Sequence, residues 1–530
     1  MTSYCSILYL VIFLPAVTVV WGIVPRSWRP FVLLGASYAF FWELSQKLVF
    51  FLFVTTAILY LAGLRLSALQ KKRDDRLKQT EKREHKALKA GCRRRQRLVL
   101  ALSVCAVLGI LIVLKYGAFV NENLNALAGW LRLPFCLPVP SFVLPIGISF
   151  YSLQAISYLA DVYRETLEAD RNPFRLALYM SFFPQLMEGP ICRYAQTAQA
   201  LWQGHTLTFR NLTFGIQRIA FGMVKKAVIA DRLNLLIETV FDGYGQYDGG
   251  VIALSMFFYT CQLYMEFSGT MDVVAGSAEI FGVKLPENFR RPFLAPTISK
   301  FWTRWHITLG TWFKDYVFYP LSMSKRLTSL TVRARKRLGN HYGPLPAAAV
   351  ALLAVWLGNG LWHGAGWHYI FFGLYHFTWI LLENLTEPVV RACAAKWRIN
   401  RESIPWRVMQ VSRTILLVNV GELFFRADSL QDGFAMFGRM TGEFTLRSLR
   451  DGTILTLGMD RMDFLIAGIS IALVLAVHIL CERGVAVRET VARQAFPVRW
   501  ALYGALFLYL IVFGAYGEGY IPVDPIYAGF

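Results

Sequence analysis

The sequence has no pair of closely spaced cysteines, and that absence excludes two common kinds of centre. Its eight cysteines are scattered singly, without a Cys-x-x-Cys spacing, so neither a cysteine-bound zinc nor a dithiol redox pair is indicated. The chain also lacks a Gly-x-Ser-x-Gly nucleophile turn, a phosphate-binding P-loop and a dinucleotide-binding glycine fingerprint. A serine nucleophile and a nucleotide-phosphate site are therefore not indicated.

Acidic residues are scarce relative to basic ones, and the basic excess is localised. The 530 residues include 55 Lys and Arg against 34 Asp and Glu. Residues 65–97 hold 14 basic and 4 acidic residues, and residues 325–337 hold 6 basic residues and no acid. No aromatic residues alternate with these basic ones, so no nucleic-acid partner is expected. Basic segments beside membrane spans stay in the cytoplasm and attract anionic lipid. We therefore predict a basic cytoplasmic loop at 65–97 that contacts membrane lipid and is helical in part, because Lys, Glu, Arg and Ala dominate it.

Long hydrophobic runs, in contrast, are abundant. Hydrophobic residues make up 55% of the chain, and the mean hydropathy is +0.42. A spanning helix needs roughly 20 apolar residues, and about 11 segments of the chain could serve. The alternating pattern of a membrane barrel is missing, as are internal repeats. The sequence therefore predicts an all-α polytopic membrane protein, with residues 1–530 forming one integral-membrane domain.

The first hydrophobic segment, at 6–24, has no charged region before it and no clear cleavage site, so we expect a retained span with the N-terminus outside the cytoplasm. Prolines in 119–141 predict an external loop, and the short apolar run at 179–190 predicts a re-entrant segment. Further spans are predicted at 31–43, 47–64, 98–116, 142–163, 212–230, 249–282, 408–424, 463–481 and 500–516.

Four glycines and a histidine interrupt one predicted span. Residues 357–368 read Leu-Gly-Asn-Gly-Leu-Trp-His-Gly-Ala-Gly-Trp-His, between apolar runs at 345–357 and 369–382. Broken backbone at membrane depth is tolerated only where protein or a water-filled cavity surrounds it, and an ionisable residue there indicates a functional site. His363 is therefore the predicted chemical centre, with a general-base role. The alternative is a histidine that only satisfies carbonyls near a kink.

A metal site is not expected around this break. His363, His368 and His376 are spaced by five and eight residues, which differs from the His-x-x-x-His spacing of zinc-binding helices.

Residues 301–316 form a second segment of interest. If this segment is helical, Trp302, His306 and Phe313 fall on one stripe, and Arg304 and Asp315 fall on the opposite one. One interpretation is an interfacial helix in which His306 is merely packed. The other is that His306 faces the core and meets His363.

The apolar segment at 249–282 carries polar side chains in pairs with helical spacing. Gln262 and Glu266 share one face, and Ser268 and Asp272 share another. Such side chains within a membrane must face the protein interior or a cavity.

The motifs together resemble the membrane-bound O-acyltransferase (MBOAT) superfamily, in its bacterial branch of alginate and peptidoglycan O-acetyltransferases and teichoic-acid D-alanyl transferases. The matching segments span about half of the chain in the family's order, at 144–151, 161–164, 182–185, 189–191, 267–272, 288–293, 301–306, 312–316, 362–367 and 424–427.

The resemblance implies the MBOAT fold, with re-entrant and interfacial helices around a central funnel. It also implies that His363 is the catalytic histidine and His306 its partner. Supporting or substrate-binding residues would be Trp362, Trp305, Arg304, Asp315, Gln262, Ser268, Asp272 and Asn288. The activity implied is transfer of an acetyl group from a cytoplasmic thioester towards hydroxyls of an extracytoplasmic polysaccharide. The location implied is the cytoplasmic membrane of a bacterium.

No bound cofactor is expected. The acyl donor would be acetyl-CoA or an acyl carrier protein, and an extracytoplasmic esterase-like protein could be a partner. Alternatives are D-alanyl transfer from a carrier protein to teichoic acid, a transporter, and an export component without acyl-transfer chemistry.

Overall fold

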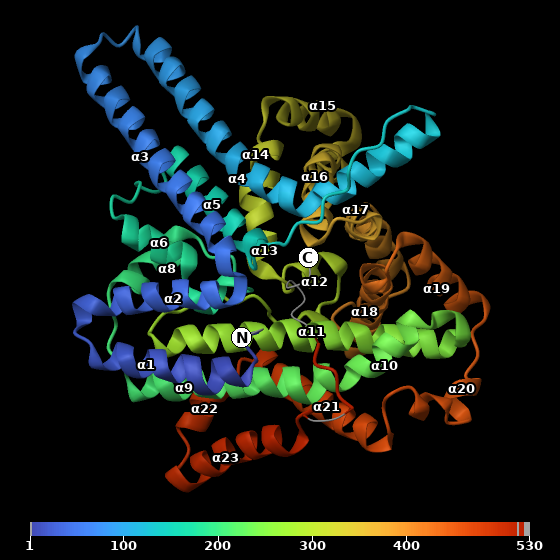
Figure 1. Ribbon diagram of the computed structural model, residues 1–530. Coiled ribbons are helices and arrows are strands. Elements are labelled where there is room, and N and C mark those ends of the chain that lie inside the picture. The colour runs from blue at the N-terminus through green and yellow to red at the C-terminus, as the bar shows by residue number, and fades with distance from the viewer. Residues whose placement is uncertain (1–2, 517–518, 524–530) are drawn as a thin grey trace. The chain divides into compact units, whose positions relative to one another are not determined.

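The computed structural model describes residues 3–516 and 519–523, and every regular element within those ranges is a helix (Figure 1). The all-α prediction is confirmed. The chain divides into two compact units. The first comprises the residues up to Ile216 together with Val274–Pro286, and the second comprises Gln217–Val273 and the chain from Glu287 onward.

The first unit is built from the N-terminal helices. They are η1 (Leu8–Phe13), α1 (Leu14–Ile23), α2 (Arg29–Ser45), α3 (Val49–Gln79), α4 (His85–Trp130), α5 (Ile148–Tyr163), α6 (Pro173–Ser181), α7 (Phe183–Leu186) and α8 (Tyr194–Trp202). Helices α9 (Phe209–Met223) and α11 (Gly249–Ile280) have residues in both units.

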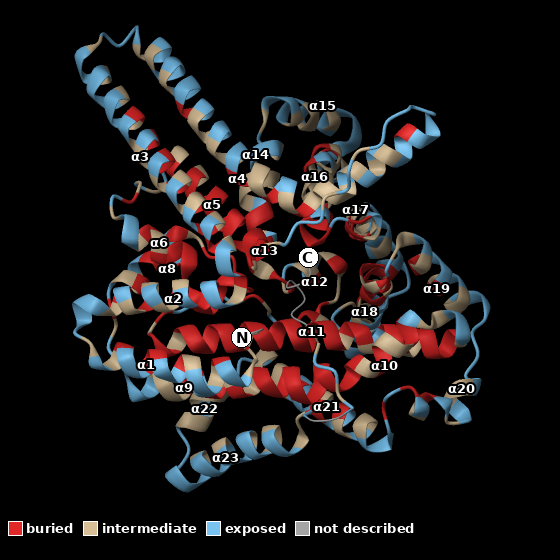
Figure 2. Cartoon of the chain, viewed as in Figure 1, coloured by how far each residue is buried: buried red, intermediate tan, exposed pale blue. Residues whose placement is uncertain are grey.

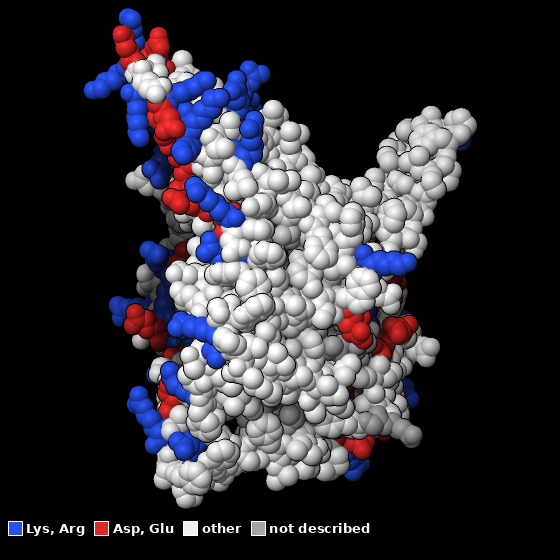
Figure 3. Space-filling model, turned by 60° about the vertical axis from the view of Figure 1, so that its left-hand side comes forward, with Lys and Arg blue, Asp and Glu red and all other residues white. Residues whose placement is uncertain are grey.

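Helices α3 and α4 pack side by side as a long hairpin whose far end is exposed (Figures 1 and 2). The partial helix predicted in the basic loop at 65–97 is confirmed and is more extensive than expected, since only residues 80–84 connect the two helices. Lys, Glu, Arg and Ala dominate this stretch, and all of them favour helix. Figure 3 shows Lys and Arg side chains gathered around the end of the hairpin.

The prediction of an external loop at 119–141 is wrong for the first half of that segment. Helix α4 continues to Trp130, and the chain leaves the helix only at residues 131–134. All the prolines of this stretch, Pro134, Pro138 and Pro140, lie beyond that point. Nothing before Pro134 therefore removes a helical hydrogen bond.

The second unit contains the remaining helices. They are η4 (Val224–Ala230), α10 (Asp231–Asp242), α12 (Ile298–Trp302), α13 (Ile307–Phe313), η7 (Lys314–Phe318), α14 (Tyr319–Ser322), α15 (Lys325–Tyr342), α16 (Leu345–His363), α17 (Trp367–Lys396), α18 (Ile404–Arg426), α19 (Leu430–Gly442), α20 (Arg447–Arg450), α21 (Arg461–Glu482), α22 (Val487–Ala492) and α23 (Phe496–Phe513).

Six helical segments of the described residues are long and apolar enough to cross a membrane. They are Arg26–Gln79, His85–Trp130, Leu345–His363, Ile404–Arg426, Arg461–Glu482 and Phe496–Phe513. These segments agree with the predicted multi-pass membrane protein. Helix α11 is 32 residues long but is not among the six. Polar side chains such as Gln262 and Glu266 lower its hydropathy.

Helices α16 and α17 form a tight hairpin because glycines allow their backbones to approach. A Cβ atom on Gly360 would lie 2.4 Å from the carbonyl oxygen of Tyr369, and one on Gly373 would lie 2.3 Å from that of Trp356. Any larger residue at either position would push the helices apart. The break predicted at 357–368 is narrower than expected, because α16 continues through His363 and only residues 364–366 leave the helical conformation.

Candidate functional site

A cavity of about 480 Å³ in the second unit is lined by both predicted histidines, His306 and His363. Helices α12, α13, α16 and α17 and the turn before α13 supply its walls. His306 and His363 are buried, whereas Thr303, Gly310 and Lys314, which also line the cavity, are exposed. The histidines therefore belong to the enclosed part of the cavity, and the exposed residues belong to its rim.

His363 is the last residue of α16, and the turn after it depends on glycine. The backbone of Gly364 is extended, and a Cβ atom there would lie 2.0 Å from Cε2 of Tyr369. The imidazole of His363 packs edge-on against Trp362 and Phe425, with ring centroids 5.0 and 5.1 Å away. These aromatic walls hold the ring, which is 6% exposed, against the cavity.

His306 lies in a sharp turn, so residues 301–316 do not form the single helix on which the two predicted stripes depended. Helix α12 ends at Trp302, α13 begins at Ile307, and His306 between them has the left-handed backbone angles φ 44° and ψ 52°. The single-helix stripe drawn through this segment is therefore wrong. Backbone hydrogen bonds from Arg290 N–H to Arg304 O (2.9 Å) and from Ile307 N–H to Asn288 O (2.9 Å) fix the turn.

Asn288 determines which nitrogen of His306 carries the proton. Its Oδ1 accepts hydrogen bonds from the backbone N–H (3.1 Å) and the hydroxyl (2.9 Å) of Thr308, and Nδ1 of His306 lies 3.2 Å from the same oxygen. A backbone N–H can only donate, so this Asn288 atom is the oxygen, and Nδ1 of His306 is the protonated nitrogen. Nε2 then carries the lone pair.

Burial lowers the pKa of His306 to about 3, so the ring is neutral at pH 7. A neutral ring with its lone pair on Nε2 can accept a proton or a hydrogen bond from a substrate.

The indole of Trp362 lies between the two histidines. Its ring centroid is 5.5 Å from that of His306 and 5.0 Å from that of His363. Trp305 lines the cavity and stacks on Phe301 at 5.4 Å. The structure therefore brings together His363, His306, Trp362, Trp305 and Asn288 of the predicted residues.

Arg304 and Asp315 are not among the residues that line the cavity. The guanidinium of Arg304 forms an ion pair with Glu482 (3.1 Å) and donates to the carbonyl of Arg291. Asp315 belongs to η7. Arg304 therefore anchors the segment that carries His306 instead of facing the cavity.

Gln262, Ser268 and Asp272 also lie outside the cavity lining, in polar networks around α11. The amide of Gln262 donates to Asn234 (2.7 Å). Asp272 pairs with Lys225 (2.6 Å) and with Arg218 (2.9 Å), and Lys225 also donates to Ser268. These contacts satisfy charged groups inside the protein, which is a structural role.

Two cavity-lining residues, Asn359 and Trp302, were not among the predicted site residues. Asn359 lines the cavity one helical turn before His363. Trp302 also lines it, and its indole N–H donates to Nδ1 of the buried His376 (3.3 Å). The spacing of four between Asn359 and His363 was a visible signal of a shared helix face.

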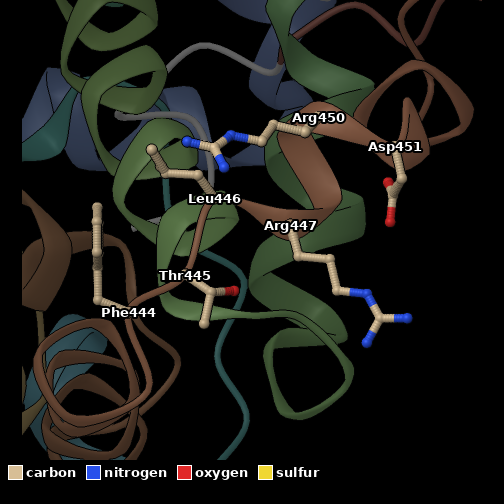
Figure 4. Close-up of a pocket in the computed structure, with 6 residues that line it drawn as sticks. All are labelled: Phe444, Thr445, Leu446, Arg447, Arg450 and Asp451. Carbon is tan, nitrogen blue, oxygen red and sulfur yellow. The ribbon is translucent and has the colours of Figure 1, made fainter.

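A second pocket contains no histidine; its lining residues are Phe444, Thr445, Leu446, Arg447, Arg450 and Asp451 (Figure 4). Its one carboxylate, Asp451, is exposed and accepts hydrogen bonds from the backbone N–H (3.0 Å) and the hydroxyl (2.7 Å) of Thr453. The predicted histidines line the cavity described above and not this pocket.

Comparison with known proteins identifies a family match over most of the chain. The model of "MBOAT, membrane-bound O-acyltransferase family" matches residues 6–334, a range that contains His306 but not His363. The probable alginate O-acetylase AlgI of Azotobacter vinelandii is 32% identical over 459 residues, which cover 86% of this chain and 81% of that protein.

Two further relatives are named for different activities. The peptidoglycan O-acetyltransferase of Helicobacter pylori is 30% identical over 66% of this chain and 65% of its own length. The teichoic acid D-alanyltransferase of Bacillus subtilis is 29% identical over 46% of this chain and 59% of its own length.

Proposed function

Because the chain belongs to the membrane-bound O-acyltransferase family and is an O-acyltransferase, we propose that it transfers an acetyl group to hydroxyls of a polysaccharide. The observation that carries this proposal is the shared cavity of His306 and His363. The similarity to an alginate O-acetylase over 86% of the chain favours acetyl as the acyl group and a polysaccharide as the acceptor.

In the proposed reaction, His363 removes the proton from the acceptor hydroxyl as its oxygen attacks the thioester carbonyl carbon. The carbonyl electron pair moves onto oxygen, the C=O bond then re-forms, and the C–S bond breaks. The leaving thiolate takes the proton held by His363 and departs as a thiol. His306, neutral and with its lone pair on Nε2, accepts a hydrogen bond from the acceptor or from the donor.

The donor in this proposal is a cytoplasmic thioester, either acetyl-CoA or an acyl carrier protein, and the acceptor lies on the opposite side of a bacterial cytoplasmic membrane. The basic end of the α3–α4 hairpin suits a cytoplasmic position beside anionic lipid or an anionic donor. An extracytoplasmic esterase-like protein is the proposed partner that completes transfer to the polymer.

The test compares His363→Ala with His341→Ala in cells of the native host that lack the chromosomal copy. His341 lies on α15, outside the cavity lining, and is exposed. Base-labile acetyl released from envelope and secreted glycans is measured by mass spectrometry. We expect His363→Ala to abolish the acetyl ester and His341→Ala to leave it unchanged. Normal acetylation by His363→Ala protein present at wild-type amounts would refute the mechanism.

The same extract separates acetyl from D-alanyl transfer. The relative that transfers D-alanine covers less than half of this chain. Base-labile D-alanine that disappears in the His363→Ala strain, with acetyl unchanged, would replace acetylation as the activity.

A further inference from the structure

Asn359 has a buried side chain whose Oδ1 receives no hydrogen bond from the described protein. It is 9% exposed and belongs to the enclosed cavity wall. Its Oδ1 is buried and has no hydrogen-bond partner among the residues that the structure describes. Buried side-chain polar atoms in folded proteins are almost always hydrogen-bonded, so a buried amide oxygen without a partner points to a ligand from outside the chain.

The position of Asn359 on its helix directs it toward the same space as the catalytic histidine. The cavity-lining residues of α16 are Leu352, Val355, Trp356, Asn359 and His363. Their spacing follows one face of an α-helix. Asn359 is the residue of this face nearest to His363, about 6 Å away along the helix axis.

The other residues of this face are apolar or aromatic, so Asn359 and His363 provide its polar groups. His306 faces the same cavity from the turn before α13. A reacting carbonyl placed between an attacking hydroxyl at His363 and the wall of α16 would lie within reach of the Asn359 amide.

We propose that Asn359 is a catalytic residue whose Nδ2–H donates a hydrogen bond to the carbonyl oxygen of the transferred acyl group. This inference rests on the proposed acyl transfer. Negative charge develops on that oxygen when the acceptor hydroxyl adds to the carbonyl carbon, and it returns to the C=O bond when the thiolate leaves. A donor fixed in an enclosed site stabilises such an oxyanion strongly.

The side-chain amide suits this role because it carries two N–H donors and can present them after rotation about χ2. Such a rotation exchanges the positions of Oδ1 and Nδ2, so an N–H can take the place of the buried oxygen that has no partner among the described residues.

The experiment uses two replacements of similar size and one matched control, each expressed as the full chain in the native host without its chromosomal copy. Asn359→Leu removes the donor and leaves an apolar side chain that should fold about as well as the wild type, because the buried Oδ1 makes no hydrogen bond that could be lost. Asn359→Asp places a carboxylate, which can only accept hydrogen bonds, where the oxyanion would form.

Asn419→Leu is the control. Asn419 lies on α18, is also buried, and its Oδ1 also has no hydrogen-bond partner among the described residues, but it does not line the cavity. Protein amount and melting temperature are measured on detergent-solubilised protein. The initial rate of ester formation is measured by pulse-labelling with isotopic acetate, followed by mild base release.

We expect Asn359→Leu and Asn359→Asp to lower the rate on the order of 10²–10³-fold, with normal protein amounts, and Asn419→Leu to remain within a few-fold of wild type. Wild-type rates with Asn359→Leu or Asn359→Asp would overturn the inference, as would equal losses with Asn359→Leu and Asn419→Leu. His363→Ala in the same assay distinguishes a failure of the proposed function from a failure of the inferred role of Asn359. If it keeps full activity, the proposed function fails; if it abolishes the ester while Asn359→Leu does not, only the role of Asn359 fails.

Discussion

Nδ1 of His306 lies 3.2 Å from Oδ1 of Asn288, an oxygen that Thr308 already identifies as an acceptor. This relationship fixes the ring tautomer and places the Nε2 lone pair on the other side of the imidazole. In hydrolase triads, a buried acceptor orients the catalytic histidine in the same way. Its consequence can be tested by changing the acceptor alone.

Asn288→Asp and Asn288→Leu should behave differently. The aspartate keeps an acceptor for Nδ1 but adds a negative charge, which raises the pKa of His306. Transfer should then be lost at a higher pH than in the wild type as the medium is acidified. The leucine leaves the ring without its orienting acceptor, and transfer should fall on the order of 10²-fold at every pH.

The measurement for the Asn288 variants is the initial transfer rate between pH 5 and 9. Asn123→Leu on α4, a helix that does not line the cavity, serves as the control. Identical pH profiles for Asn288→Asp and the wild type would contradict this role of Asn288.

Burial of the neutral His306 should make the stability of the protein depend on pH. The pKa of His306 is about 3 in the folded protein, below the value of about 6.5 in the unfolded chain. The unfolded state therefore binds more protons between these values, and the free energy of unfolding falls as the pH is lowered from about 6.5 towards 3. His306→Asn, which suits a left-handed backbone, should lose this component. Melting temperatures of detergent-solubilised protein across this range measure it, and parallel curves would show the expectation to be wrong.

Gly364→Ala should disrupt the turn that presents His363. The added Cβ would lie 2.0 Å from Cε2 of Tyr369, so the ring or the backbone must move. We expect transfer to fall at least tenfold, because small displacements of catalytic groups are costly. Gly109→Ala on α4, where nothing lies within 4 Å of the new Cβ, is the matched control and should be tolerated. Equal activity of the two variants would argue against a positional role for the turn.

Asp272→Asn should destabilise the protein without altering the cavity. The change removes the carboxylate that pairs with Lys225 and Arg218, and breaking a buried ion pair costs about 3–5 kcal/mol. Adding Lys225→Met should recover part of that loss, because the uncompensated charge is then gone. Thermal unfolding of the two single variants and of the double variant measures the coupling. Additive effects would mean that the pair does not act as a unit.

The end of the α3–α4 hairpin should be accessible only from the cytoplasm. An epitope inserted within residues 80–84 lies in an exposed connection, where insertions are tolerated. Antibody should label it in permeabilised cells and not in intact ones. Labelling of intact cells would reverse the proposed topology.

Composition and hydrophobic patterning sufficed for the helical class and for the helices at both ends of the basic segment, because Lys, Arg, Glu and Ala leave little alternative to helix between the spans. The glycine pattern around His363 also indicated a break correctly, although it overestimated its length. Gly358 and Gly360 proved to be packing positions inside α16, and a contact with a neighbouring helix is not visible in a local pattern.

The conformation of His306 could not be read from the sequence. Its periodicity fitted a continuous helix, whereas the backbone is left-handed and held by the strand-like pairing of residues 288–290 with 304–307. Asn359 was overlooked for a related reason. A single asparagine among glycines resembles part of a loop, and only the continuation of α16 to His363 gives it a fixed direction.

The backbone angles at residue 306 limit which amino acids the protein can accept there. Valine, isoleucine and threonine are strongly disfavoured with φ near 44°, whereas glycine, asparagine and aspartate adopt this region more easily. A saturation library at this codon should therefore separate two requirements. Variants that fold should carry residues that tolerate the left-handed backbone conformation. Active variants should be those among them whose side chain also offers a lone pair to the substrate.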